Sequence, residues 1–231
     1  MTGSISPNSA FCQANNCRIN WIKKGSGASL KAMKAGKVDL VMVHAPAAEK
    51  NAVNEGWATM RTLLGSNEFY IVGPKDDPAG IAAAKSASDA YARIAESQST
   101  FLSRGDNSGT HKKELAIWKK AGLNPEGNWY LITKAFMMAT LKKADQVKGY
   151  FMTDSSTFFV KQSKLKNLEI LFKGDPVLVN VYHALVASPE KYPQANSALA
   201  AKFVSFMDSP EGQKIYRDYG KSAYGSALYN D

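Results

Sequence analysis

Apolar residues along this chain follow two patterns, short continuous runs and helical spacing. Residues 38–44 and 68–73 are short runs rich in Val, Ile and aromatic residues, which is typical of strands buried on both faces. Residues 81–97 are alanine-rich with helical periodicity. The other predicted strands are residues 17–24, 129–133, 149–152, 168–172 and 177–187. The other predicted helices are residues 28–35, 135–147 and 196–207, with further helices opening at 153–157 and at Ser209-Pro210. This alternation predicts an α/β fold with mainly parallel sheets flanked by helices.

The most informative stretch is residues 103–114, SRGDNSGTHKKE, which lies on a predicted strand-to-helix turn. A strand end precedes it at residues 100–102, and Leu115, Trp118 and Ala121 follow at helical spacing. The first N–H groups of a helix have no partner within the helix, and the helix dipole adds partial positive charge there. An oxyanion therefore fits such a turn.

The side chains of this turn suit the same ligand. Arg104 offers a permanently charged fork of donors, and Ser108 and Thr110 offer rotatable hydroxyls. Gly109 lets the backbone approach a ligand closely. The simpler interpretation is a capped helix, with a cap worth about 1 kcal/mol, beside an exposed arginine.

Three other places offer weaker candidates of the same kind. Ser26 and Gly27 lie in a Gly-Ser-Gly turn between a predicted strand and helix, and such turns are common for structural reasons alone. His44 ends a predicted strand, where open sheets place their ligands, although a lone histidine is more often structural. Ser155 and Thr157 open a predicted helix, as caps or as the rim of a cleft.

Composition excludes several classes of protein. With 45% hydrophobic and 21% charged residues the chain is an ordinary folded protein, and no apolar run reaches the roughly 18 residues of a membrane span. A net charge of +9 favours anionic partners, but the lysines are dispersed and no base-reading module is present, so nucleic acid is not expected. No signal peptide opens the sequence. Either the chain is cytoplasmic or a leader has been removed.

The chain has two cysteines, Cys12 and Cys17. They lack the second pair that a structural zinc site needs. A local disulfide and two free thiols are both compatible with the spacing.

An enzyme would need a nucleophile and a base. Ser108 and His111, with Asp154 brought near by folding, are the one Ser–His–Asp combination that we considered, and no nucleophile-elbow motif accompanies it. The three histidines form no metal-binding motif. We therefore expect neither catalysis nor a cofactor nor a metal.

The sequence resembles the tungstate- and molybdate-type substrate-binding proteins of ABC transporters, in the type II periplasmic-binding-protein superfamily. The resemblance is carried by SRGDNSGTHKKE and extends through GSGASL, VDLVMVHAPAAEK, YIVGPKDDPAGI, GYFMTDSST, KGDPVLVNVY and SPEGQKI. Two departures stand out. Thr2 and Ser4 are the nearest match to the family's threonine-rich anion loop, and DSST at 154–157 replaces its Asp-Arg-Gly-Thr motif.

The resemblance implies two α/β lobes with the ligand in the cleft between them. Lobe 1 is expected to comprise residues 1–75 and 180–231, and lobe 2 residues 76–179, with crossing strands near 73–78 and 176–182. The implied protein is a monomeric, periplasmic or extracellular receptor whose leader has been removed. It is expected to capture a small oxyanion, tungstate or molybdate first, for ABC permease subunits. The alternatives are a ligand-sensing domain of the same fold, or a diverged relative that binds another small anion.

Overall fold

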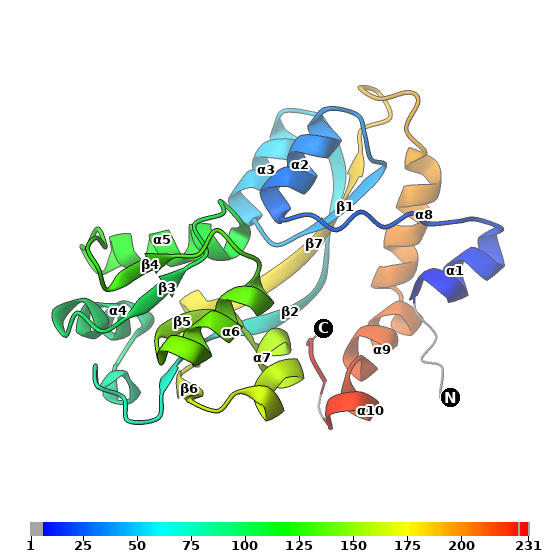
Figure 1. The fold of residues 1–231 in the computed structure, drawn as a ribbon. Coiled ribbons are helices and arrows are strands. Elements are labelled where there is room, and N and C mark those ends of the chain that lie inside the picture. The colour runs from blue at the N-terminus through cyan, green and yellow to red at the C-terminus, as the bar shows by residue number, and fades with distance from the viewer. Residues whose placement is uncertain (1–6, 226, 231) are drawn as a thin grey trace. The chain divides into compact units, whose positions relative to one another are not determined.

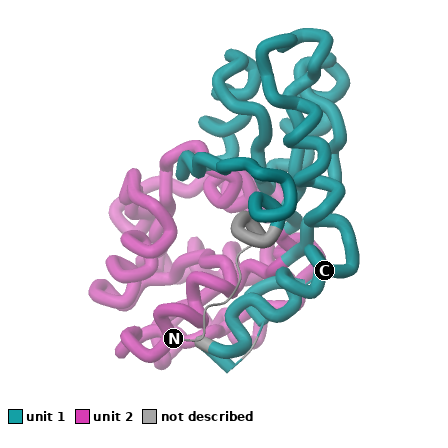
Figure 2. The backbone as a smooth tube through the Cα atoms, turned by 90° about the vertical axis from the view of Figure 1, so that its right-hand side faces the viewer, with its two compact units in different colours: residues 1–66, 181–231 teal, residues 67–180 magenta. Residues whose placement is uncertain are grey.

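Two strands carry the chain between two compact units. In this computed structural model, which describes residues 7–225 and 227–230, unit 1 is Met1–Ser66 with Val181–Asp231 and unit 2 is Asn67–Asn180 (Figure 2). β2 (Ala58–Pro74) and β7 (Val179–Ala187) each contain a point where the chain passes from one unit to the other. The first division lies before the boundary at residue 75 that the sequence predicted, and the second adjoins the predicted boundary at residue 180.

The elements alternate as an α/β fold requires, and Figure 1 labels them along the chain. The remaining strands are β1 (Leu40–Val43), β3 (Phe101–Ser103), β4 (Tyr130–Ile132), β5 (Tyr150–Asp154) and β6 (Leu168–Phe172). The helices are α1 (Pro7–Asn15), α2 (Ser26–Lys34), α3 (Pro46–Asn54), α4 (Ala87–Glu96), α5 (Gly109–Lys120), α6 (Met137–Val147), α7 (Ser155–Lys161), α8 (Ser197–Asp208), α9 (Pro210–Asp218) and α10 (Lys221–Tyr224). Short 3₁₀ turns lie at Ile81–Ala83, Gln162–Lys164 and Pro176–Leu178.

Strands β3 and β5 of unit 2 are buried on both faces. Successive side chains of a strand point to opposite faces, and Phe101 packs in a cluster with residues of α4 and α5, whereas Leu102 packs with residues of α6 and α7. Tyr150 and Phe151 of β5 divide between the same two clusters. Two-sided burial explains the continuous apolar runs seen in the sequence.

Unit 1 repeats this arrangement around β1 and β7. Val41 and Val43 of β1 pack with residues of α2 and α3, whereas Leu40 and Met42 pack with residues of α8. Phe11 of α1 completes the second cluster, with its ring edge-on to Phe203 at a centroid distance of 5.1 Å. Both ends of the chain therefore contribute to one core.

The predicted α/β class is confirmed, but the strand directions are not mainly parallel. β3 pairs in parallel with β4 and β5, whereas β2 is antiparallel to β5 and β6, and β1 is antiparallel to β7. An apolar run indicates burial on both faces, and antiparallel strands covered by helices on both faces produce the same run. The continuous apolar runs therefore could not predict whether neighbouring strands are parallel or antiparallel.

The segment after α1 also differs from its prediction. Residues 17–24 form no strand, and the side chains of Trp21 and Ile22 are each 59% exposed. Aromatic and β-branched residues favour a strand only where a neighbouring strand is available to pair with them. Cys17, the first residue of this segment, forms a disulfide with Cys12. Of the two alternatives for these cysteines, a local disulfide and two free thiols, the structure has the disulfide. Thr2 and Ser4 lie outside the described residues.

We expect Phe101→Ala to lower the free energy of unfolding by about 3–5 kcal/mol, because it removes a large fully buried side chain. The ring of Phe101 contacts those of Tyr91 and Trp118 at 5.2 Å each, so the cavity has little means of collapsing. Urea denaturation followed by tryptophan fluorescence measures the change. Leu115→Ala, at a position 43% exposed, is the control and should cost about 0.5 kcal/mol. Equal losses would contradict this account of the core.

Candidate functional site

The anion turn predicted from the sequence lies between β3 and α5, and both flanks are fixed by the core of unit 2. Phe101 and Leu102 are fully buried ahead of it, and Ile117 and Trp118 are buried behind it. Within the turn, Gly105 adopts a φ of +59°, and an added Cβ would lie 2.3 Å from Cγ2 of Ile132. A glycine is therefore required there both for backbone conformation and for space.

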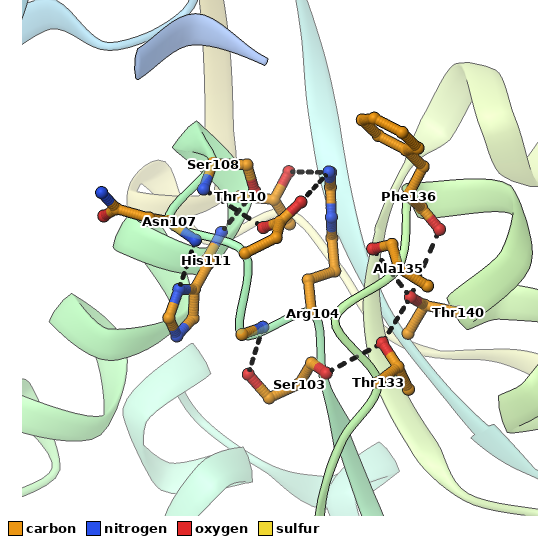
Figure 3. Close-up of polar contacts among 12 residues, drawn as sticks. Ser103, Arg104, Asn107, Ser108, Thr110, His111, Thr133, Ala135, Phe136 and Thr140 are labelled. Carbon is orange, nitrogen blue, oxygen red and sulfur yellow. Dashed lines mark hydrogen bonds and ion pairs between the residues drawn. The ribbon is translucent and has the colours of Figure 1, made fainter. Parts of the chain in front are cut away.

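Arg104 is buried inside this turn, only 7% exposed (Figure 3). Its Nη1 donates to Oγ1 of Thr110 at 3.4 Å, and its Nη2 donates to a carboxylate oxygen of Asp106 at 2.5 Å. The ring of Phe136 lies 6.0 Å from the guanidinium carbon, and the buried Nε has no hydrogen-bond partner among the described residues. The arginine is thus held in place without using all five of its N–H donors.

Ser108 begins α5 and Thr110 lies in its first turn. The Oγ of Ser108 accepts a hydrogen bond from the backbone N–H of His111 at 3.3 Å, which makes Ser108 the N-cap. The Thr110 hydroxyl accepts from Arg104 and so still has a proton to donate, whereas the Ser108 side chain also hydrogen-bonds the Asp106 carboxylate. The structure therefore brings Arg104, Ser108, Gly109 and Thr110 together at one helix start.

Asp106 is a member of this site that sequence reasoning missed. One oxygen of its carboxylate accepts from Arg104 and the other accepts from the backbone N–H of Ser108 at 3.1 Å. Burial opposes its ionisation, but the Ser108 hydrogen bonds and the Arg104 charge outweigh burial and lower the pKa of Asp106. From the sequence, Asp106 was only a candidate N-cap of the predicted helix, beside an arginine expected to be exposed. An incoming anion would share the guanidinium with this carboxylate.

The Ser108–His111–Asp154 combination considered from the sequence is not assembled. Nδ1 of His111 accepts from the backbone N–H of Asn107 at 3.1 Å, and the Ser108 hydroxyl bonds the His111 backbone, not its ring. Burial lowers the pKa of His111, so the ring is neutral at pH 7. The carboxylate of Asp154 is occupied at the start of α7. This geometry supplies no activated nucleophile.

The start of α7 carries its own negative charge. Asp154 accepts from the backbone N–H of Thr157 at 2.8 Å and from the Thr157 hydroxyl at 2.7 Å, and Ser156 also donates to it. Ser155 is buried and hydrogen-bonds the side chain of Tyr70. A carboxylate already fills the position that an anion would take at this helix. Ser155 and Thr157 thus have partners within unit 2.

Unit 1 holds the remaining predicted residues together. The Oγ of Ser26, at the first position of α2, accepts from the backbone N–H of His44 at 3.2 Å, and Gly27 follows it. The N-cap of α2 is Gly25, which provides no side-chain cap. The ring of His44 lies 5.3 Å from that of Tyr182. The helix start of α2 is therefore without an internal carboxylate, unlike that of α7.

A buried charged cluster supports this turn of unit 1, and sequence reasoning missed it. Glu49 is fully buried and accepts from the backbone N–H of Ala45 at 2.6 Å and from Nε of Arg61 at 3.0 Å. His183 lies 3.0 Å from the same carboxylate, and burial, together with the charge of Arg61, lowers the pKa of His183 to about 4. Glu49 lies four residues after Ala45, the N-cap of α3, so it does not form the Ser/Thr-x-x-Glu capping box that a sequence would reveal. The partners on β2 and β7 were not readable.

A second buried carboxylate lies on α5 behind the anion turn. Glu114 is 2% exposed and accepts from the hydroxyl of Tyr130 at 2.6 Å. Burial, which outweighs hydrogen bonds from Tyr130 and Ser103, raises the pKa of Glu114 to about 7. Burial and the neighbouring Glu114 also raise the pKa of Tyr130. The hydrogen bond between Glu114 and Tyr130 thus joins α5 to β4.

Among residues 7–225 and 227–230, no group of three or more His, Cys, Asp or Glu side chains is placed to hold a metal ion. No described helix is long and apolar enough to cross a membrane.

Two α/β units joined by β2 and β7, with polar strand-to-helix turns in each, define a solute-binding domain, and comparison with known proteins agrees. The family model described as a PBP superfamily domain matches residues 8–211. The tungstate-binding protein TupA of Peptoclostridium acidaminophilum is 35% identical over 95% of this chain and 77% of its own length. The crystal structure of the tungstate ABC transporter from Geobacter sulfurreducens superposes with a TM-score of 0.83 at 41% identity, over 92% of this chain and 90% of that chain.

The chain belongs to the PBP superfamily and, within it, to the tungstate-type substrate-binding proteins of ABC transporters. Proteins of this family bind solutes for transport and are not normally enzymes. A 41% identical protein of Haloferax volcanii covers 96% of this chain, and the chain spans 66% of that protein's length.

The raised pKa of Glu114 predicts how stability depends on pH. Since the folded pKa of about 7 lies above the ordinary value of 4.5, the folded state holds this proton more tightly than the unfolded state. The contribution is complete below pH 4.5 and is lost as the pH rises to about 7, a decrease of about 3 kcal/mol. Glu114→Gln should remove this decrease. Urea denaturation between pH 4 and 8 measures it, with exposed Glu126→Gln as control; an unchanged pH profile in Glu114→Gln would contradict the assignment.

Proposed function

We propose that this chain captures a small tetrahedral oxyanion, with tungstate or molybdate as the first candidates, and delivers it to the permease subunits of an ABC transporter. The observation that carries the proposal is the buried guanidinium of Arg104 at the start of α5, with the hydroxyls of Ser108 and Thr110 beside it. Tetrahedral oxyanions present several acceptor oxygens, and these donors are grouped at one helix start. The relatives named for tungstate binding support this choice of ligand.

The donors expected to contact the anion are Arg104, Ser108, Gly109 and Thr110 in unit 2. Ser26 and Gly27 in unit 1 are proposed as further contacts, since α2 begins without a carboxylate and the Ser26 hydroxyl retains a proton to donate. His44 is proposed as a neighbour of that subsite, because its backbone N–H bonds Ser26. Ser155 and Thr157 are weaker candidates, since their partners lie within unit 2.

The role that we propose is binding without catalysis, outside the cytoplasm, by a monomer. The histidine near the turn is neutral and bonds the backbone, so nothing in this geometry activates the Ser108 hydroxyl. Binding and release are all that delivery to a transporter requires.

Calorimetric titration tests the ligand class directly. We expect tungstate and molybdate to bind with dissociation constants well below 1 mM, a level that corresponds to only about −4 kcal/mol. Sulfate and phosphate, titrated under the same conditions, measure selectivity among tetrahedral anions. Failure of all four anions to bind at millimolar concentration would exclude this class of ligand.

Arg104→Ala should weaken oxyanion binding by about 1.5–3 kcal/mol, roughly 10- to 150-fold in the dissociation constant, because it removes a charge-assisted donor. Arg93→Ala is the matched control, since Arg93 lies in the same unit and pairs with Asp89 at 3.2 Å. A second variant, Arg104→Ala with Asp106→Asn, separates the lost donor from the repulsion of an unpaired Asp106 carboxylate. Equal affinity in Arg104→Ala and the parent protein would remove Arg104 from the site.

A further inference from the structure

Two asparagine side chains meet at the two ends of unit 2. Asn67 and Asn180 are the first and last residues of that unit, and they are 4% and 2% exposed. Nδ2 of Asn180 donates to Oδ1 of Asn67 at 2.8 Å. Strands β2 and β7, which carry these residues, are neighbours in the strand order. A buried hydrogen bond therefore joins the two crossing strands where the chain enters and leaves the unit.

Lys113 of α5 contacts both crossing strands close to the asparagine pair. Its Nζ donates to the carbonyl oxygens of Val177 at 2.8 Å and Val179 at 2.7 Å, and it lies 5.6 Å from the ring centroid of Phe69. Val179 is adjacent to Asn180 in β7, and Phe69 follows Asn67 closely in β2. Lys113 is half-buried, and this burial lowers its pKa. One side chain thus contacts both strands beside the asparagine pair.

The same helix begins with the anion turn. Gly109, the first residue of α5, and Lys113 are one helical turn apart and lie on the same face. Within the helix the backbone N–H of Lys113 bonds the carbonyl of Gly109, so the first turn and Lys113 are directly linked, while Ile117 and Trp118 further along are fully buried in the core. A displacement of its first turn therefore reaches the Lys113 ammonium.

The asparagine pair is not fully satisfied in this arrangement. Nδ2 of Asn67 is buried and has no hydrogen-bond partner among the described residues. A buried amide donor without a partner costs free energy. The contact between the two crossing strands is therefore less stable than a fully hydrogen-bonded pair would be.

We propose that Lys113 is a positioning residue that transmits anion occupancy of the Arg104 turn, through α5, to the paired asparagines at the two chain crossings. This inference rests on the proposed function. It adds the route by which anion binding at the Arg104 turn would affect Asn67 and Asn180 in the crossing strands. Lys113 touches the strands and not the ligand.

Hydrogen–deuterium exchange with and without tungstate tests the proposal in the parent protein, Lys113→Met and Lys112→Met. Lys112→Met is the matched control, because Lys112 is an exposed lysine on the same helix and its replacement removes the same charge. In the parent and the control, tungstate should slow exchange at residues 108–111 and change it at residues 66–70 and 177–182. In Lys113→Met, the change at 108–111 should remain and the change at the crossings should vanish, with a dissociation constant raised about 5-fold or more.

Each outcome decides the proposal. If Lys113→Met keeps the tungstate-dependent change at both crossings, Lys113 is not the coupling residue even though the parent binds tungstate. If the parent binds neither tungstate nor molybdate, the proposed function fails and this inference fails with it. Lys113→Arg, which retains donors for both carbonyls, should restore the change at the crossings; general loosening of the fold would instead raise exchange at β3 and β5 in ligand-free Lys113→Met.

Discussion

The ion pair between Arg104 and Asp106 is the interaction on which the anion turn depends. A guanidinium that is only 7% exposed needs a counter-charge, because an unpaired buried charge costs several kcal/mol. Asp106 provides that charge and also accepts the Ser108 N–H, so one carboxylate satisfies two groups that an oxyanion would otherwise satisfy. The turn is therefore assembled before any ligand arrives. At the proposed site an incoming anion would share Arg104 with a neighbour of the same sign, and its net affinity would depend on the donors that Asp106 leaves available.

The three helix starts that the sequence grouped together differ in this same respect. α7 begins at Asp154, whose carboxylate receives the Thr157 N–H and hydroxyl, so its positive end is already neutralised. α2 begins after Gly25, with no side-chain cap and a serine hydroxyl beside its first turn. The start of α5 is intermediate: it has a carboxylate, that of Asp106, but this carboxylate is paired with the positive charge of Arg104. Similar strand–turn–helix geometry thus has different anion chemistry according to the charge each turn already contains.

The parts of the fold that the sequence predicted are those determined by local pattern. β1, the part of β2 from Glu68 to Gly73, and α8 follow from runs and periodicity, because two-sided burial and helical faces leave a signature in neighbouring residues. The earlier part of β2 is mixed in polarity and was missed, as was α3. Strand direction was also missed, since it depends on where the chain goes next.

The site divides in the same way. Arg104, Ser108, Gly109 and Thr110 could be grouped from sequence because they are consecutive in one turn. The pairing of Asp106 with Arg104 depends on left-handed backbone at Gly105 and Asn107, which sequence spacing alone does not specify. The cluster of Glu49, Arg61 and His183 joins α3, β2 and β7, and contacts between distant segments leave no local pattern.

α5 unites these roles because a helix presents residues four apart on one face. Thr110 and Glu114 are both buried, with Trp118 behind them, so the ligand turn, the Tyr130 contact and the aromatic core follow one another along a single buried stripe. Lys113, offset by one residue, points to a neighbouring face and reaches the crossing strands. The core therefore fixes the far half of the helix while its first turn carries the anion donors. If an anion binds at that turn as proposed, the contacts of Thr110, Lys113 and Glu114 would all lie within about one helical turn of it.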